Sequence, residues 1–346
     1  MNTHDFLKQD NHSIKIILTF LVMFFLLSTS SLHAQTIKNN PTDQGLTTNN
    51  PGSDLWRQVR QRDATLLVGK SQVKSVDSGV LINVQGDKWA NFRMKQFIHY
   101  SQYALVAVLV ILVLIYFLMG TSKIEGGPSG NMVQRFKKLE RWTHWGMAIF
   151  FIGLAITGLV LMFGRGMLIP LLGKEVFSGL AVFSKTIHNW SGPLFLFSLL
   201  LMLVTYMRKN LYASGDLGWL LKAGGVFSKE HTSAGFFNMG EKIMFWMVIL
   251  VGLVLSISGL ILLFPGYGQD RIMMELSHVV HGVSSVFLIA LTIGHMYMAL
   301  VGVEGTTQAM THGYVDIKWV EAHHDRWAEE VKQNNLVIPA AEFTQK

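Results

Sequence analysis

The chain has no cysteine among its 346 residues, which excludes disulfides, cysteine-ligated zinc and iron–sulfur clusters supplied by this chain. Charge is also scarce: 15% of the residues are charged, against about 25% in an average soluble domain. Apolar residues make up 50% of the chain, a composition typical of membrane proteins. The net charge of +7 therefore indicates membrane orientation first, and it offers no support for nucleic-acid binding.

The N-terminus carries a short apolar run, Ile14–Leu27, interrupted by Lys15 and followed by small polar residues. A spanning helix needs about 20 apolar residues, so this run is too short to be a typical span. The pattern predicts a signal peptide over residues 1–34, cleaved near Ala34. An uncleaved membrane anchor is the alternative.

Long apolar stretches follow, and each can cross about 30 Å of hydrocarbon as a helix. Helices are expected because lipid offers no partners for exposed backbone groups. We predict five spans: Ile98–Met119, Trp142–Phe163, Ile187–Met207, Ile243–Phe264 and Leu276–Val301.

Basic residues predict the orientation of these spans. Lysine and arginine concentrate in the segments that follow the first and third spans, so these two segments are predicted inside. The connection Pro265–Glu275 holds only Arg271 and is predicted outside. Cleavage of the signal peptide independently places the C-terminus inside. The sequence predicts a multi-pass protein of a bacterial inner membrane, with residues 35–97 an external periplasmic arm, 98–119 an extra transmembrane helix, 120–141 an internal linker, 142–305 a four-helix domain and 306–346 a cytoplasmic tail. We find no internal repeat.

Histidines in the last four spans are the candidate functional residues: His144, His188, His278, His281 and His295. A polar side chain inside a membrane bundle is a functional candidate by default, although any single one can instead be a hydrogen-bonding core residue. The other histidines have simpler interpretations, and His312, His323 and His324 are expected in the polar tail.

The predicted topology sorts these histidines by depth. His188 and His281 fall near the outer surface, whereas His144 and His295 fall near the inner surface. His281 and His295 are about 21 Å apart along one helix and share one face. Two pairs, each drawn from two helices, match two bis-histidine hemes stacked across the bilayer. His278, one turn before His281, is a rival ligand at the outer site.

The predicted spans carry no acidic or basic residue in their central parts. Ion-coupled transporters usually carry such groups along their pathway, so a histidine-lined metal transporter is disfavoured. Electron transfer needs no charged path.

Spans two to five resemble the cytochrome b (gamma) subunit of membrane-bound formate dehydrogenase. The resemblance rests on RWTHW at 141–145, IHNWSGPLF at 187–195, FNMGEKIMFW at 237–246, HGVSSVFLIALTIGHMYMA at 281–299 and KWVEAHHDRW at 318–327. PGSDLWRQVR and GVLINVQGDKWANFR resemble the external arm of the longer members. The implied fold is an all-α membrane protein: a four-helix transmembrane di-heme cytochrome b bundle with one extra N-terminal helix and a small external arm.

The resemblance implies that His188 and His281 ligate the outer heme b, and that His144 and His295 ligate the inner heme b. It also implies a quinone pocket, for menaquinone or ubiquinone, beside the inner heme. There the family carries Asn-x-Gly-Gln, where this chain has Asn238, Gly240 and, as a departure, Glu241. Glu241 either transfers a quinone proton or, as we favour, caps its helix. Lys242 is expected at the membrane interface.

The implied partners are an iron–sulfur beta subunit and a molybdenum- or tungsten-pterin alpha subunit that oxidises formate. This chain would be the quinone-reducing, electron-transfer subunit and would not oxidise formate itself. Two alternatives stay open: a cytochrome b subunit of a hydrogenase or of another molybdenum oxidoreductase, and a heme-free membrane anchor.

Overall fold

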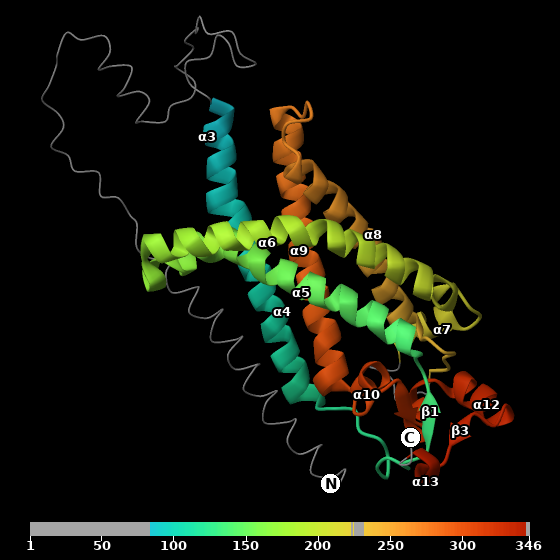
Figure 1. The fold of residues 1–346 in the computed structure, drawn as a ribbon. Helices are drawn as coiled ribbons and strands as arrows, with labels where there is room; N and C mark the ends of the chain where they lie inside the picture. Colours follow the sequence, from blue (N-terminus) through green and yellow to red (C-terminus); the bar gives the residue numbers. More distant parts are fainter. Residues whose placement is uncertain (1–83, 223, 225–231, 344–346) are drawn as a thin grey trace, which may run out of the picture. The chain divides into compact units, whose positions relative to one another are not determined.

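The computed structural model is dominated by long helices, and five in its described part are long and apolar enough to cross a membrane (Figure 1). The structure describes residues 84–222, 224 and 232–343. The predicted signal peptide and most of the predicted arm therefore lie outside the described residues. The described chain divides into two units, residues 84–102 and the residues from Tyr103 onward.

The first unit is helical throughout. It consists of α3 (Val84–Asn91), the π-helical segment η3 (Phe92–Phe97) and the first residues of α4 (Ile98–Met119). The candidate span runs over Gly86–Met119 and so begins earlier than the predicted Ile98. Hydropathy marks where the apolar stretch begins, whereas polar residues such as Lys88 and Arg93 continue the same helix.

The other predicted spans are confirmed as helices: α5 (Lys138–Met167), α6 (Ile169–Tyr206), α8 (Met239–Leu263) and α9 (Arg271–Tyr297). α6 begins well before the predicted Ile187, because Lys174, Glu175 and Lys185 lie within its helix. His188 therefore lies near the middle of α6 and not at its start. A kink at Gly173, where φ is +80°, lets the chain turn back from α5 into α6.

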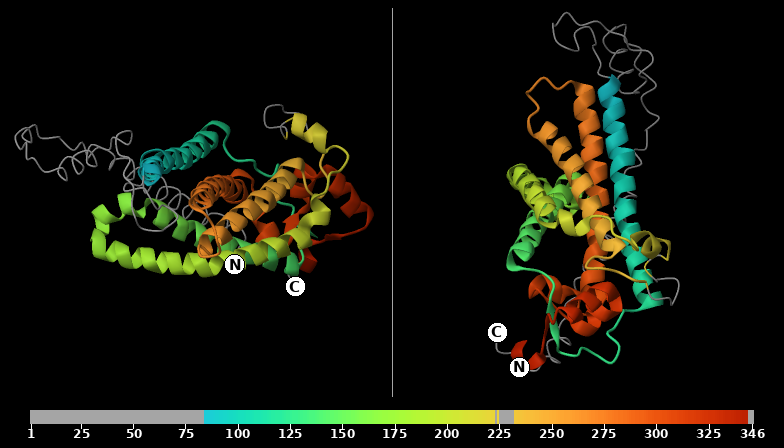
Figure 2. Two further views of the ribbon diagram at one scale, coloured as in Figure 1. Left: turned by 90° about the horizontal axis from the view of Figure 1, so that it is seen from above. Right: turned by 90° about the vertical axis from the view of Figure 1, so that its right-hand side faces the viewer.

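These four helices form two antiparallel hairpins. α5 packs along α6 and α8 packs along α9, while α6 also contacts α8. The α5–α6 hairpin lies obliquely across the α8–α9 hairpin (Figures 1 and 2). A Cβ on Gly252 of α8 would come within 2.9 Å of Leu199 of α6, so glycine allows these two helices to approach closely.

A small three-stranded sheet joins two segments that the sequence analysis treats separately. β1 (Met132–Gln134) comes from the predicted linker, and it pairs antiparallel with β2 (Tyr314–Asp316) and β3 (Val337–Ile338) of the predicted tail. The tail also carries α10 (Thr306–Thr311), α11 (Ile317–His323), α12 (Asp325–Gln333) and α13 (Ala340–Phe343). The remaining elements are η4 (Met207–Asn210), α7 (Asp216–Leu221) and η6 (Met298–Gly302).

We refer to β1 together with residues 306–343 as the C-terminal layer. Val133, Val315 and Val320 are almost fully buried in it, as are Trp319 and Val331. These side chains are continuous with the core of the helical hairpins. The predicted tail is therefore a packed part of the fold, and the predicted linker supplies its central strand.

Candidate functional site

His188 and His281 face each other across the two hairpins. His188 comes from α6 and His281 from α9, and their ring centres lie 6.1 Å apart with an angle of 70° between the ring planes. Nδ1 of His188 lies 2.9 Å from Oγ1 of Thr157, and Nδ1 of His281 lies 3.0 Å from the carbonyl of Leu255. In both rings Nδ1 thus forms a hydrogen bond to a neighbouring helix, which leaves Nε2 available as a ligand.

His144 and His295 form a second pair. His144 lies in the second turn of α5 and His295 near the end of α9, and their ring centres are 6.3 Å apart at an angle of 56°. Within the described part of the chain, the buried Nδ1 of His144 has no hydrogen-bond partner. His295 keeps more exposed surface than His144, His188 and His281, which are half-buried.

Both ring separations fit histidine ligation of heme iron. A metal–imidazole bond is about 2 Å long and the ring centre lies about 1 Å beyond the nitrogen, so two imidazoles on opposite sides of one iron have ring centres about 6 Å apart. The measured separations are 6.1 and 6.3 Å. Neutral imidazoles on facing helices are the donor set that a bundle uses to hold heme.

The rival ligand His278 does not take part in either pair. Its side chain is exposed, and the ring that lies against His188 belongs to His281. The geometry therefore favours His281 over His278 at this position.

Asn238, Gly240 and Glu241 lie at the start of α8. The side chain of Asn238 accepts from the Glu241 backbone at 2.9 Å, and a Glu241 carboxylate oxygen accepts from the Asn238 backbone at 2.9 Å. This is a complete capping box, as the cap interpretation of Glu241 expects. A Cβ on Gly240 would lie 2.8 Å from the ring of Trp219, so glycine there lets α7 pack against α8.

Glu241 also holds a buried cation that the sequence analysis did not single out. Nη2 of Arg135 lies 2.7 Å from the other Glu241 carboxylate oxygen, and the Arg135 side chain is only 2% exposed. Aromatic rings surround this guanidinium, and the nearest is Trp319, whose ring centre is 4.7 Å away. Phe136, Phe236, Phe237 and Trp327 complete the surrounding rings, 5.5–5.7 Å from the guanidinium carbon. Arg135 thus links the linker, α8 and the C-terminal layer.

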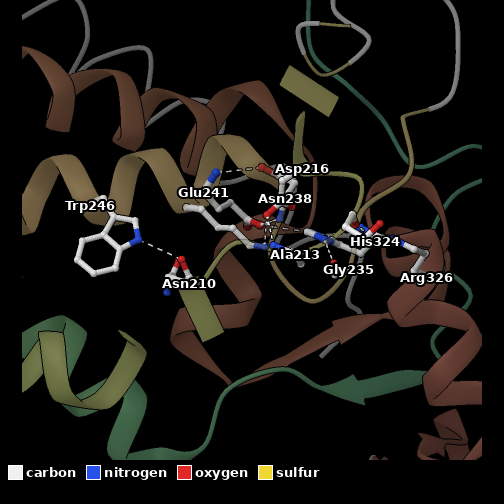
Figure 3. Close-up of polar contacts among 11 residues, drawn as sticks. Asn210, Ala213, Asp216, Gly235, Asn238, Glu241, Trp246, His324 and Arg326 are labelled. Atoms are coloured by element: carbon white, nitrogen blue, oxygen red, sulfur yellow. Dashed lines mark hydrogen bonds and ion pairs between the residues drawn. The ribbon is translucent and has the colours of Figure 1, made fainter. Parts of the chain in front are cut away.

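His324 approaches the same carboxylate (Figure 3). It is 1% exposed, its Nε2 lies 3.8 Å from Glu241, and its Nδ1 donates to the carbonyl of Gly235 at 2.8 Å. The expectation that His324 lies in a polar tail is wrong, because the tail folds back over the start of α8. The string KWVEAHHDRW was the only sequence signal for this position.

Lys242 forms a second ion pair in this region with Asp216, which is labelled in Figure 3. Nζ of Lys242 lies 2.7 Å from the carboxylate, and the side chains of Lys242 and Asp216 are 7% and 3% exposed. The sequence analysis expected Lys242 at the membrane interface; in the structure its side chain is buried in this ion pair. Asp216 also accepts from the backbone of Ala213 at 2.7 Å, which satisfies the buried carboxylate further.

Lowering the pH is expected to loosen the C-terminal layer through His324. Burial lowers the pKa of His324 to about 4, an effect that the neighbouring Glu241 only partly offsets. In the unfolded segment the pKa of histidine is about 6.5, so the unfolded segment takes up the proton at a higher pH than the folded one does. The contribution of neutral His324 to the free energy of unfolding is therefore complete above a pH of about 6.5 and is lost as the pH falls to about 4. The contribution lost is about 3 kcal/mol.

Protease susceptibility of the C-terminal layer at pH 7 and pH 5 checks this expectation. His324→Gln should remove much of the pH dependence, whereas His312→Gln, which changes an exposed histidine, should leave it intact. Equal pH dependence in both variants would contradict the assignment.

A family model for prokaryotic cytochrome b561 matches residues 135–313. The chain belongs to the prokaryotic cytochrome b561 family. It is a multi-pass membrane protein of a family of electron-transfer cytochromes that bind heme b, and its mainly helical bundle agrees with the predicted fold class. The matched range contains all four paired histidines.

Several relatives are cytochrome subunits of formate dehydrogenases. The cytochrome b556(Fdn) subunit of the nitrate-inducible enzyme of Escherichia coli K12 is 30% identical over 210 residues, which cover 59% of this chain and 93% of the relative. The cytochrome b556(fdo) subunit of the same organism is 28% identical over 207 residues, with 59% and 95% covered. The cytochrome b556 subunit of Haemophilus influenzae is 27% identical over 219 residues, with 60% and 87% covered. These relatives confirm the resemblance identified from the sequence.

Proposed function

We propose that this chain is the cytochrome b subunit of a membrane-bound formate dehydrogenase complex, passing electrons from an iron–sulfur subunit to quinone. The observation that carries the proposal is the pairing of four histidines from three helices into two ring pairs, each about 6 Å between centres. The names of the relatives favour formate as the electron source. The chain itself has no cysteine for an iron–sulfur cluster, so that group belongs to a partner.

Each histidine pair would hold one heme b. His188 and His281 would hold the first, and His144 and His295 the second. Heme b supplies one-electron redox chemistry at its iron. The protein's own part is to hold four neutral imidazoles on rigid helices, so that little rearrangement accompanies each electron transfer.

A quinone pocket at the start of α8 is the second part of the proposal. Asn238, Gly240 and Glu241 lie there. The Glu241 side chain is 34% exposed although both of its oxygens have protein partners. We assign Glu241 the role of shaping this end of α8, with Asn238 as the cap.

The proposed orientation places the arm in the periplasm and the C-terminal layer in the cytoplasm of a bacterial inner membrane. It rests on the basic residues that follow the first and third spans. Two electrons moving inward against an inside-negative potential cost about 4.6 kcal/mol per 100 mV, which the complex would conserve as membrane potential. A molybdenum- or tungsten-pterin subunit outside would oxidise the formate.

Formate added to the complex purified through this chain is expected to reduce its b-type hemes, because the relay begins at the external catalytic subunit. The measurement is the reduced-minus-oxidised spectrum under anaerobic conditions, with the chain alone as the control that formate cannot reduce. Reduction by hydrogen but not by formate would overturn the proposal in favour of a hydrogenase subunit. A spectrum without any b-type band would support a heme-free anchor.

A further inference from the structure

A five-residue pattern occurs once in each hairpin. Residues 154–158 read Leu-Ala-Ile-Thr-Gly in α5, and residues 255–259 read Leu-Ser-Ile-Ser-Gly in α8. Each pattern faces a histidine on the following helix of its own hairpin, His188 on α6 and His281 on α9. The repeat is short and lies within two otherwise ordinary apolar spans, so hydropathy alone does not reveal it.

In the first hairpin, the hydroxyl of Thr157 orients His188. The Thr157 hydroxyl donates to the carbonyl of Gly153 at 2.8 Å, so its oxygen is free to accept from Nδ1 of His188, 2.9 Å away. Thr157 is buried, and a Cβ on Gly158 would lie 3.4 Å from Cε1 of His188. The histidine ring therefore lies against the glycine, while the neighbouring hydroxyl accepts a hydrogen bond from its Nδ1.

In the second hairpin, the corresponding serine and glycine lie beside His281, together with the carbonyl of Leu255. Nδ1 of His281 lies 3.0 Å from the carbonyl of Leu255 and 3.4 Å from the hydroxyl of Ser258, which itself donates to the carbonyl of Val254 at 2.8 Å. A carbonyl can only accept, so Nδ1 must carry the proton. A Cβ on Gly259 would lie 3.0 Å from Cε1 of His281, closer than ordinary contact.

In the other pair, His144 lacks this arrangement. The buried Nδ1 of His144 has no hydrogen-bond partner within the described ranges. The two pairs therefore differ in what lies behind their rings, although their ring separations are nearly equal.

Hydrogen bonds from Nδ1–H fix the tautomer of a ligating histidine and make Nε2 more basic. A more basic ligand stabilises ferric iron over ferrous iron and so lowers the midpoint potential. We propose that the two Leu-x-Ile-(Ser/Thr)-Gly segments are matched positioning elements that orient His188 and His281 and set the heme of this pair at a lower potential than the heme of His144 and His295. The inference rests on the proposed histidine ligation. A lower potential at the pair of His188 and His281 would make electron transfer from it to the pair of His144 and His295 favourable.

Thr157→Val tests the proposal, because it removes the hydroxyl and keeps the shape. Potentiometric titration of the purified complex should show two hemes per chain, with only the lower midpoint potential raised. A tenfold change in the ferric-to-ferrous ratio, about 59 mV for one electron, is the expected size. Thr157→Ser should restore the original value. Ser258→Ala should shift the same heme less, because the carbonyl of Leu255 remains as the closer acceptor.

Ser198→Ala is the matched control, because it removes a buried hydroxyl that donates to the carbonyl of Phe195 in its own helix. It should leave both potentials unchanged. Unchanged potentials in Thr157→Val, equal shifts of both hemes, or no rescue by Thr157→Ser would overturn the proposal.

A second variant probes the glycine. Gly259→Ala should displace His281 and lower heme occupancy at this pair, whereas Gly179→Ala, where a Cβ meets nothing within 4 Å, should keep both hemes. Full occupancy with unchanged potentials in Gly259→Ala would contradict a positioning role.

The histidine variants separate this inference from the proposed function. If His281→Ala loses a heme while Thr157→Val changes nothing, only the positioning role fails. If His281→Ala and His188→Ala both retain two hemes, the ligand assignment itself fails.

Discussion

Replacing His281 with alanine is expected to remove one of the two hemes proposed for this chain. His281 lies opposite His188 with 6.1 Å between ring centres, so the change leaves His188 as the one remaining imidazole of this pair. His295→Ala should also leave one heme, but the one with the lower midpoint potential. The measurement is heme per chain from the pyridine hemochrome, combined with a potentiometric titration that shows which potential is lost.

His278→Ala is the matched control, because it removes an exposed histidine one helical turn away. Both hemes should remain. Where His281→Ala fails to fold, His281→Met provides a second test: a methionine ligand should keep the heme and raise its potential. Two hemes at unaltered potentials in both His281 variants would rule out His281 as a ligand.

Arg135→Met is expected to detach the C-terminal layer from the start of α8. The change leaves Glu241 without its cation and removes the charge from the aromatic surroundings of Trp319. Breaking a fully buried ion pair costs about 3–5 kcal/mol, and the exposed third of Glu241 lowers the expected loss to about 2–4 kcal/mol. Limited proteolysis of residues 306–343 and the thermal midpoint in detergent measure the effect.

Lys332→Met provides the comparison for Arg135→Met, because Lys332 makes an exposed ion pair with Glu321 that should contribute little. Adding Glu241→Gln to Arg135→Met should recover part of the stability, since no unpaired carboxylate remains. Equal protease resistance in Arg135→Met and Lys332→Met would show that the buried pair does not hold the layer in place.

Helix positions and the histidine pairs were largely predictable, for a physical reason. Lipid forces a spanning segment into a helix, so hydropathy locates each span. The period of the helix then places His281 and His295 on one face, and the topology predicts which histidine lies opposite each of them. Span ends were less accurate, as the early start of α6 shows, because charged residues end an apolar stretch without ending a helix.

Polar partners of the site were mostly not predictable. Arg135 and His324 are far apart in sequence and read as ordinary basic residues of a linker and a tail. Only the sheet that joins β1 to β2 and β3 brings both to Glu241. The Asp216–Lys242 pair likewise depends on α7 packing against α8.

The amino-acid sequence by itself determined that this protein is a helical membrane protein, and it identified four histidines at two depths, because apolar length and helical period are local properties. Tertiary structure decided which groups stand behind those histidines and how the C-terminal layer closes over α8. Those contacts arise only when separate helices and strands pack together, so no local pattern encodes them.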